Sequence, residues 1–264
     1  MDYSPAISSV SSSETTIQEN SQILWKQLLS LATLYASVII GWIAYYNYQP
    51  ILLETYNFTD LTLFLFIVQG IIMVIAPPIA GRLGDKFRVK AGKRLPIISA
   101  GVSFAAMIFM ATAFTLFVHP GPIFKWILPV LITLWLFSMA IFTSPALSTI
   151  ELFVPTKKLP TAMAILTIVY GLLYSIEPVI VDLINFIGAP LTFVVGGVAV
   201  FFSGLLLRKN STIITDKPKL TEVGKSDFTY AFFLGMALGI VTTILFNLFP
   251  TWFEEKGFSI FGVT

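Results

Sequence analysis

Seven long apolar runs constrain the fold of this chain more than any other feature. A helix needs roughly 20 mostly apolar residues to cross the hydrocarbon core of a bilayer. The runs cover Leu28–Leu53, Leu61–Ala80, Pro96–Val118, Trp126–Ile150, Thr161–Ile187, Pro190–Leu207 and Phe228–Trp252. They are continuously apolar rather than alternating, and open sheet edges cannot face lipid. The sequence therefore predicts an all-α membrane protein with seven transmembrane helices.

The composition places the chain in lipid rather than in water. Hydrophobic residues make up 56% of the 264 residues and charged residues only 11%, and the mean hydropathy is +0.86. A water-soluble domain of this composition would lack the polar surface that it needs. We therefore expect an integral, multi-pass membrane protein that has the lipid bilayer as its first partner.

Basic residues predict the orientation in the membrane. Six of the sixteen Lys and Arg residues lie in the fifteen-residue stretch Gly81–Leu95, between the second and third runs. With a cytoplasmic N-terminus, fourteen of the sixteen lie on the cytoplasmic side, and Lys125 and Lys256 lie outside. Because basic loops stay in the cytoplasm, we predict this orientation, in the plasma (inner) membrane. Residues 1–22 are polar and are expected to form a disordered cytoplasmic tail.

An internal repeat predicts how the chain is divided. At an offset of 200 residues, Asn47, Pro50, Glu54, Phe58 and Thr59 align with Asn247, Pro250, Glu254, Phe258 and Ser259. The seventh run therefore resembles the start of a second copy. We predict an N-terminal six-helix bundle over 23–207, a cytoplasmic linker over 208–227, and the first helix and outer loop of a truncated C-terminal bundle over 228–264. On this interpretation the chain is the N-terminal part of a twelve-helix protein. A genuine seven-helix protein is the alternative.

The basic stretch carries a specific pattern of glycines and charges. The residues that form it are Gly81, Leu83, Gly84, Asp85, Lys86, Gly92, Lys93 and Arg94. They resemble the signature loop between the second and third helices of the major facilitator superfamily. The segment GKRLPIISAG more specifically resembles the glycoside-pentoside-hexuronide and sucrose-type branch of sugar transporters. The resemblance implies a major facilitator-type six-helix bundle plus the first helix of a second bundle.

The glycines, the aspartate and the cations of this loop suit different physical roles. Gly81 and Gly84 permit a tight turn and a close approach between helices. Asp85 can pair with a cation or with the positive end of a helix, and the Lys and Arg residues can anchor the loop to anionic head groups. The resemblance implies that Asp85 helps to latch two bundles in one conformation, with a partner partly in the second bundle. A basic anchor loop without a conformational role is the alternative.

The first run carries a polar and aromatic stripe. Trp42, Tyr45, Tyr46 and Gln49 follow the i, i+3, i+4, i+7 spacing of one helix face, and Asn47 lies on an adjoining face. Flat rings beside amides suit a sugar, because its C–H faces stack and its hydroxyls hydrogen-bond. An interfacial aromatic belt would look similar.

Two further amides extend this prediction to other runs. Gln69 lies in the second run and either lines the same cavity or makes a hydrogen bond between helices. Asn247 matches Asn47 across the repeat, so the two are predicted to face each other over a central cavity.

The fifth run carries a second stripe that ends in a carboxylate. Tyr170, Tyr174 and Glu177 follow helical spacing, so we expect Glu177 to point into the bundle. An intramembrane carboxylate usually marks an ion or substrate pathway, which makes Glu177 the candidate coupling residue. A structural hydrogen bond to a neighbouring helix is the alternative. Pro178 follows directly and is expected to kink the helix.

These features together favour a transporter. We predict a secondary active transporter of a sugar or similar small polar solute that works by alternating access and is coupled to H+ or another cation such as Na+. An exporter of drugs or other small apolar solutes is the alternative, and a seven-helix receptor or non-transporting membrane protein is the alternative of another class. The sequence contains no Cys, no metal-ligand cluster and no Gly-rich phosphate loop. We therefore expect no enzymatic activity, no cofactor, no metal and no nucleic-acid partner.

Overall fold

The computed structural model of the protein describes residues 22–55, 62–118 and 126–211, together with Phe58 and scattered positions between 230 and 244. The chain divides into two compact units, Met1–Pro218 and Lys219–Thr264. All helices with defined bounds belong to the first unit. Most of the predicted seventh run, Phe228–Trp252, lies outside the described residues.

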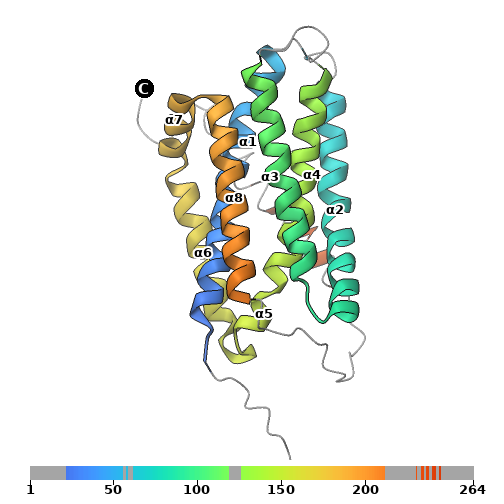
Figure 1. Ribbon diagram of the computed structural model, residues 1–264, viewed down its shortest axis with the longest axis vertical. Coiled ribbons are helices and arrows are strands. Elements are labelled where there is room, and N and C mark those ends of the chain that lie inside the picture. Colours follow the sequence, from blue (N-terminus) through green and yellow to red (C-terminus); the bar gives the residue numbers. More distant parts are fainter. Residues whose placement is uncertain are drawn as a thin grey trace, which may run out of the picture. The chain divides into compact units, whose positions relative to one another are not determined.

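The first unit is a bundle of long helices in which successive long helices run in opposite directions (Figure 1). The elements are α1 (Trp25–Thr55), α2 (Thr62–Ala91), α3 (Leu95–Phe117), α4 (Ile127–Ser148), the short α5 (Ile150–Phe153), a 3-10 turn (Thr156–Lys158), α6 (Leu159–Ser175), α7 (Glu177–Ile187) and α8 (Ala189–Ser211). Within the described residues, six helical segments are long and apolar enough to cross a membrane. The predicted all-α membrane fold is confirmed.

The basic stretch is more helical than the sequence predicts. Helix α2 continues through it to Ala91, so that only residues 92–94 connect α2 with α3. The tight turn expected at Gly81 and Gly84 is therefore wrong, because both residues lie within the helix. The turn is at Gly92, whose φ of 64° lies in the left-handed region that glycine tolerates best. The predicted close approach holds at Gly84, where a Cβ atom would lie 3.2 Å from Cβ of Pro145 on α4.

The predicted fifth run, Thr161–Ile187, is divided into two helices. Helix α6 ends at Ser175 and α7 begins at Glu177, with Ile176 between them. Pro178 lies in the first turn of α7, where its missing N–H is tolerated, whereas inside a continuous helix it would remove a hydrogen bond. Helix α8 runs to Ser211, so the first four residues of the predicted linker are helical.

Most of the described Lys and Arg residues lie at the end of the bundle that is at the bottom of Figure 1. The α2–α3 connection, the 3-10 turn and the end of α8 all lie there. Their cations are Arg82, Lys86, Arg88, Lys90, Lys93, Arg94, Lys157, Lys158, Arg208 and Lys209. We call this end of the bundle the basic end.

Helix α3 packs closely against both α4 and α8. A Cβ atom on Gly101 of α3 would lie 2.6 Å from Cβ of Phe142 on α4. A Cβ atom on Gly204 of α8 would lie 2.4 Å from Cγ1 of Val102 on α3. In lipid the helices gain no hydrophobic free energy from meeting each other, so such close backbone contacts supply much of the association. These glycines therefore hold the centre of the bundle together.

The contact at Gly204 predicts a packing defect. We expect Gly204→Ala to destabilise the protein by roughly 1–3 kcal/mol, because the β-branched Val102 cannot move its Cβ, which lies 3.1 Å from the added atom. The measurement is the midpoint of heat unfolding of the detergent-solubilised protein. Gly171→Ala is the control, since no described atom outside its own stretch of helix lies within 4 Å of the added Cβ. Equal midpoints for the two variants would contradict the packing argument.

Candidate functional site

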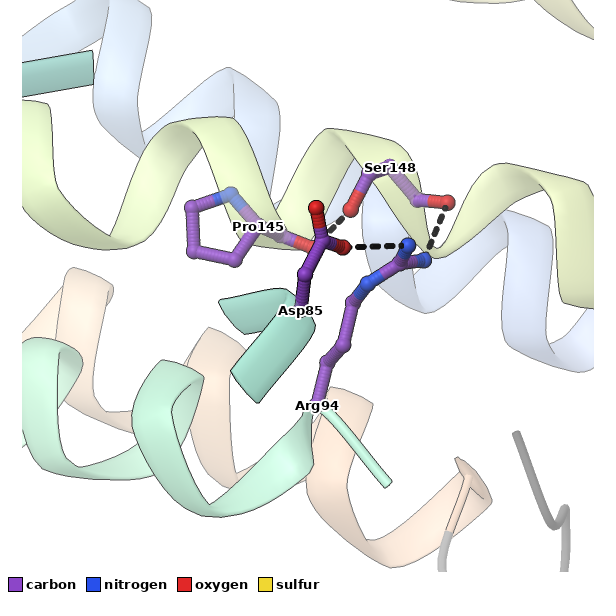
Figure 2. A network of polar contacts seen from close by, with 4 residues as sticks. All are labelled: Asp85, Arg94, Pro145 and Ser148. Atoms are coloured by element: carbon purple, nitrogen blue, oxygen red, sulfur yellow. Dashed lines mark hydrogen bonds and ion pairs between the residues drawn. The ribbon is translucent and has the colours of Figure 1, made fainter. Parts of the chain in front are cut away.

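A buried arginine ties the α2–α3 connection to the end of α4. Nη2 of Arg94 donates to Oδ1 of Asp85 at 3.0 Å, and Nη1 donates to the Ser148 carbonyl oxygen at 3.4 Å (Figure 2). The Ser148 hydroxyl in turn donates to the Pro145 carbonyl at 2.8 Å. The Arg94 side chain is only 8% exposed, whereas that of Asp85 is 65% exposed.

The position of Arg94 follows from the chemistry of a helix end. The last carbonyls of a helix lack the i+4 N–H partners of its interior and form the negative end of its dipole, so they favour a cation. We expected part of the partner of Asp85 to lie in a second bundle, and the structure gives it Arg94 from its own loop. Arg94 itself is buried against α4 and is not a head-group anchor, in contrast to Lys86, which is exposed on α2. The exposed side of Asp85 remains open to a further contact.

Four tyrosines gather where α1 meets α6. Tyr170 and Tyr174 of α6 have ring centroids 4.6 Å apart. Tyr170 lies near Tyr35 and Tyr46 of α1. Tyr46 is 62% exposed and Tyr170 is 44% exposed, so the surface of this group consists largely of phenol rings. We call Tyr35, Tyr46, Tyr170 and Tyr174 the tyrosine cluster.

Glu177 lies at one edge of the tyrosine cluster. It is half-buried, is the first residue of α7 and interacts electrostatically with Tyr174. The sequence predicts it inside a continuous helix, and the structure places it directly after the break at Ile176. An N-terminal helix position suits a carboxylate, because the exposed N–H groups and the positive end of the helix dipole favour negative charge.

Trp42 connects the tyrosine cluster with the protein core. Its ring stacks on Tyr46 with centroids 5.8 Å apart and meets Tyr45 edge-on at 5.6 Å. Tyr45 stacks on the fully buried Trp135 of α4 at 4.8 Å. The aromatic surface therefore continues inward from the cluster to the centre of the bundle.

Two amides lie behind these rings, between α1 and α2. Oε1 of Gln69 accepts hydrogen bonds from the Tyr45 hydroxyl at 2.6 Å and from Nε2 of Gln49 at 2.7 Å. Both glutamines are buried, and we call them the glutamine pair. Gln69 makes the hydrogen bond between helices that was one of its two expected roles. Among the described residues, neither its Nε2 nor the nearby Nε1 of Trp135 has a hydrogen-bond partner.

The structure unites most, but not all, of the predicted substrate residues. Trp42, Tyr46, Gln49 and Gln69 are joined by ring contacts and hydrogen bonds through Tyr45. The stacked pair Tyr170 and Tyr174 lies near Tyr46, and the predicted coupling residue Glu177 lies near Tyr174. Asn47 lies apart from this group and donates to Oδ1 of Asn185 on α7 at 3.0 Å. Asn247, its predicted counterpart, lies outside the described residues.

The predicted substrate set omits two members of this group, Tyr35 and Tyr45. Tyr35 precedes Trp42 by seven residues and therefore shares its helix face, which is a signal that the sequence contains. Tyr45 is part of the predicted stripe, but its bond to Gln69 depends on how α1 and α2 meet. Within the described ranges, no three His, Asp or Glu side chains come together as ligands for a metal ion would.

Comparison with protein families identifies the class of this protein. A family model described as the Major Facilitator Superfamily matches residues 4–176, about two thirds of the chain. The chain belongs to the major facilitator superfamily. Members of the superfamily are membrane transporters, so this chain is a multi-pass transporter protein. No curated protein and no solved structure matches it significantly.

The glutamine pair predicts a measurable energetic coupling. We expect Gln69→Met and Gln49→Met each to lower stability, because each change removes one partner of a buried hydrogen bond. The two changes should be non-additive by roughly 0.5–1.5 kcal/mol, the range of hydrogen bonds between transmembrane helices. The measurement is a double-mutant cycle of unfolding midpoints. Strict additivity would show that the bond contributes nothing to stability.

Proposed function

We propose that the protein is a secondary active transporter that moves a sugar or a similar small polar solute by alternating access, coupled to H+ or another cation. The observation that carries this proposal is the group formed by the tyrosine cluster, Trp42, the glutamine pair and Glu177. It combines exposed rings, hydroxyls and amides on helices that are long and apolar enough to span the membrane with one carboxylate at the first residue of α7.

The chemistry of this group suits a polyhydroxylated solute. Exposed Tyr46 and Tyr170 offer flat faces to the C–H surface of a sugar and hydroxyls to its oxygens. Nε2 of Gln69 and Nε1 of Trp135, on either side of Tyr45, have no hydrogen-bond partner among the described residues. A buried donor without a partner costs free energy. A solute hydroxyl or a water molecule that reached them would recover part of that cost.

Glu177 is the proposed coupling residue. A carboxylate at membrane depth is expensive unless it is neutralised by a proton, a cation or a donor. The break between α6 and α7 places it at a helix N-terminus, the arrangement by which broken helices bind charged groups in transporters. Loading Glu177 with a proton or cation next to Tyr174 would link ion binding to the solute site.

Glu177 can be tested by separating exchange from accumulation. In proteoliposomes that contain the full-length protein, we expect Glu177→Gln to retain counterflow exchange of an accepted radiolabelled sugar. Accumulation driven by a proton or sodium gradient should fall about tenfold or more, because a neutral amide cannot exchange a proton. Glucose, xylose, maltose and sucrose are the probes. Asp182→Asn, at an exposed position of α7, is the control and should retain both activities. Gradient-driven accumulation that persists in Glu177→Gln would rule out this coupling role.

We further propose that the Asp85–Arg94–Ser148 network biases the alternating-access equilibrium, with the basic end in the cytoplasm. Arg94 connects α2 and α3 to α4, so breaking the ion pair changes how these helices are held. Because Asp85 is mostly exposed, the pair contributes modestly, in the range of partly solvated ion pairs.

Asp85→Asn should therefore shift the conformational populations without removing solute affinity. A contribution of about 1 kcal/mol corresponds to a shift of roughly fivefold. The chain has no cysteine, so single cysteines at the exposed Thr161 and Ser175, near the two ends of α6, report accessibility directly through their labelling rates. Lys86→Gln is the control, since it changes a neighbouring charge outside the ion pair. Unchanged labelling rates in Asp85→Asn would contradict this role.

Export of a small apolar solute is the second candidate. It is favoured by one observation: the exposed side chains of the group are aromatic, whereas both glutamines are buried behind them. Uptake of the four sugars and efflux of ethidium, measured with the same proteoliposomes, separate the two candidates. Ethidium efflux without uptake of any sugar would favour the exporter.

A further inference from the structure

We propose that a groove between α3 and α8 at the basic end binds the phosphate of an anionic phospholipid. A cavity of about 510 Å³ lies here, and its polar lining comes from both helices and from the connection that precedes α3: Lys93, Ser99, Ser103 and Arg208. Among the residues that the structure describes, no acidic side chain lines it. The groove is therefore a positively charged site that is assembled only when the two helices pack together.

The local helix geometry adds to the attraction for a phosphate. Lys93 lies two residues before the first residue of α3, where the unpaired N–H groups and the helix dipole favour an anion. Arg208 lies in the last turn of α8, which runs antiparallel to α3. A Lys ammonium has three N–H donors and an Arg guanidinium has five, so each can bind a phosphate oxygen in addition to its other interactions.

A buried hydroxyl that has no partner among the described residues lies next to the groove. Lys93 also lines a small adjacent cavity together with Ser211, the last residue of α8. The Ser211 side chain is 2% exposed, and its hydroxyl has no hydrogen-bond partner among the described residues. A buried hydroxyl without a partner costs free energy, so this corner of the bundle favours a polar ligand.

The surface beyond the groove identifies the ligand as an amphiphile. Ser99 and Ser103 lie on one face of α3, and the same face continues with the exposed Met107, Met110 and Phe114. On α8, Leu205 and Val198 precede Arg208 in the sequence and lie on the same side of the helix. They are 40% and 44% exposed. A phosphate at the cations and an acyl chain along this apolar strip match the two halves of one phospholipid. Basic pockets between transmembrane helices at the membrane surface are sites of this type.

The site differs in place and chemistry from the proposed solute site, which lies on α1, α2, α6 and α7. Its test therefore does not depend on which solute is transported. Binding of this lipid would hold α3 against α8 at the basic end, because the phosphate would bridge Lys93 before α3 and Arg208 on α8.

The test titrates the full-length protein in mild detergent with dioctanoyl phosphatidylglycerol and follows the midpoint of heat unfolding. We expect saturable stabilisation by this lipid and weaker stabilisation by dioctanoyl phosphatidylcholine, whose head group has no net charge. In the double variant Lys93→Gln/Arg208→Gln, the half-saturating concentration should rise roughly tenfold, since each basic residue near an anionic lipid contributes a few-fold. The matched control Lys86→Gln/Lys90→Gln removes two exposed charges of the same basic stretch and should leave it unchanged.

Several results would overturn the proposal. They are an equal rise in both double variants, no rise in either, or indistinguishable titrations with the two lipids. Sodium phosphate at matched ionic strength is the third ligand. If it stabilises the protein as well as the anionic lipid does, the groove binds free phosphate and the lipid assignment is wrong. Each variant is compared with its own lipid-free midpoint. If the double variant is unstable, the single variant Arg208→Gln is compared with Lys90→Gln instead. The half-saturating lipid concentration should then rise in Arg208→Gln alone, by a smaller factor than in the double variant.

Discussion

The close packing of α3 against α4 and α8 is the contact on which the rest of the bundle depends. Lipid surrounds the helices with a solvent as apolar as their own side chains, so association relies on close backbone approach. Gly101 and Gly204 permit this approach because a side chain at either position would overlap Phe142 or Val102. Helix α8 also packs against α1, so the α3–α8 contact indirectly sets where the aromatic side of α1 faces.

The polar and aromatic side chains between α1, α2 and α6 differ in how deeply they are buried. Phenol rings of the tyrosine cluster form the exposed surface, Trp42 lies behind them, and the glutamine pair lies deepest, bonded to Tyr45. Amides at this depth need partners, because an unsatisfied amide in hydrocarbon is costly. The faces of aromatic rings do not have this requirement, so they can lie exposed at this depth.

Two neighbouring residues at the start of α3 have opposite surroundings. Arg94 turns toward the end of α4, is buried there and pairs with the mostly exposed Asp85, whereas Lys93 lines the groove toward α8. Arginine suits the buried position, because its planar guanidinium can bind a carboxylate and a carbonyl at once. The basic stretch therefore connects α2 and α3 to α4 through Arg94, and it borders α8 through Lys93.

The sequence by itself determined the helical fold and the long apolar helices, because these follow from apolar length. From Pro178 it predicted a kink in the fifth run, through the missing N–H, and the structure has a complete break at Ile176. The sequence also determined the family, through the spacing of Gly81, Gly84, Asp85 and Arg94. Only the tertiary structure decided that the basic stretch stays helical to Ala91, since Lys and Arg are good helix formers that hydropathy alone counts as loop. It also decided that Gln49 meets Gln69 while Asn47 meets Asn185. Helical spacing fixes the face of a side chain, but its partner depends on the rotation and approach of a second helix, which only packing sets.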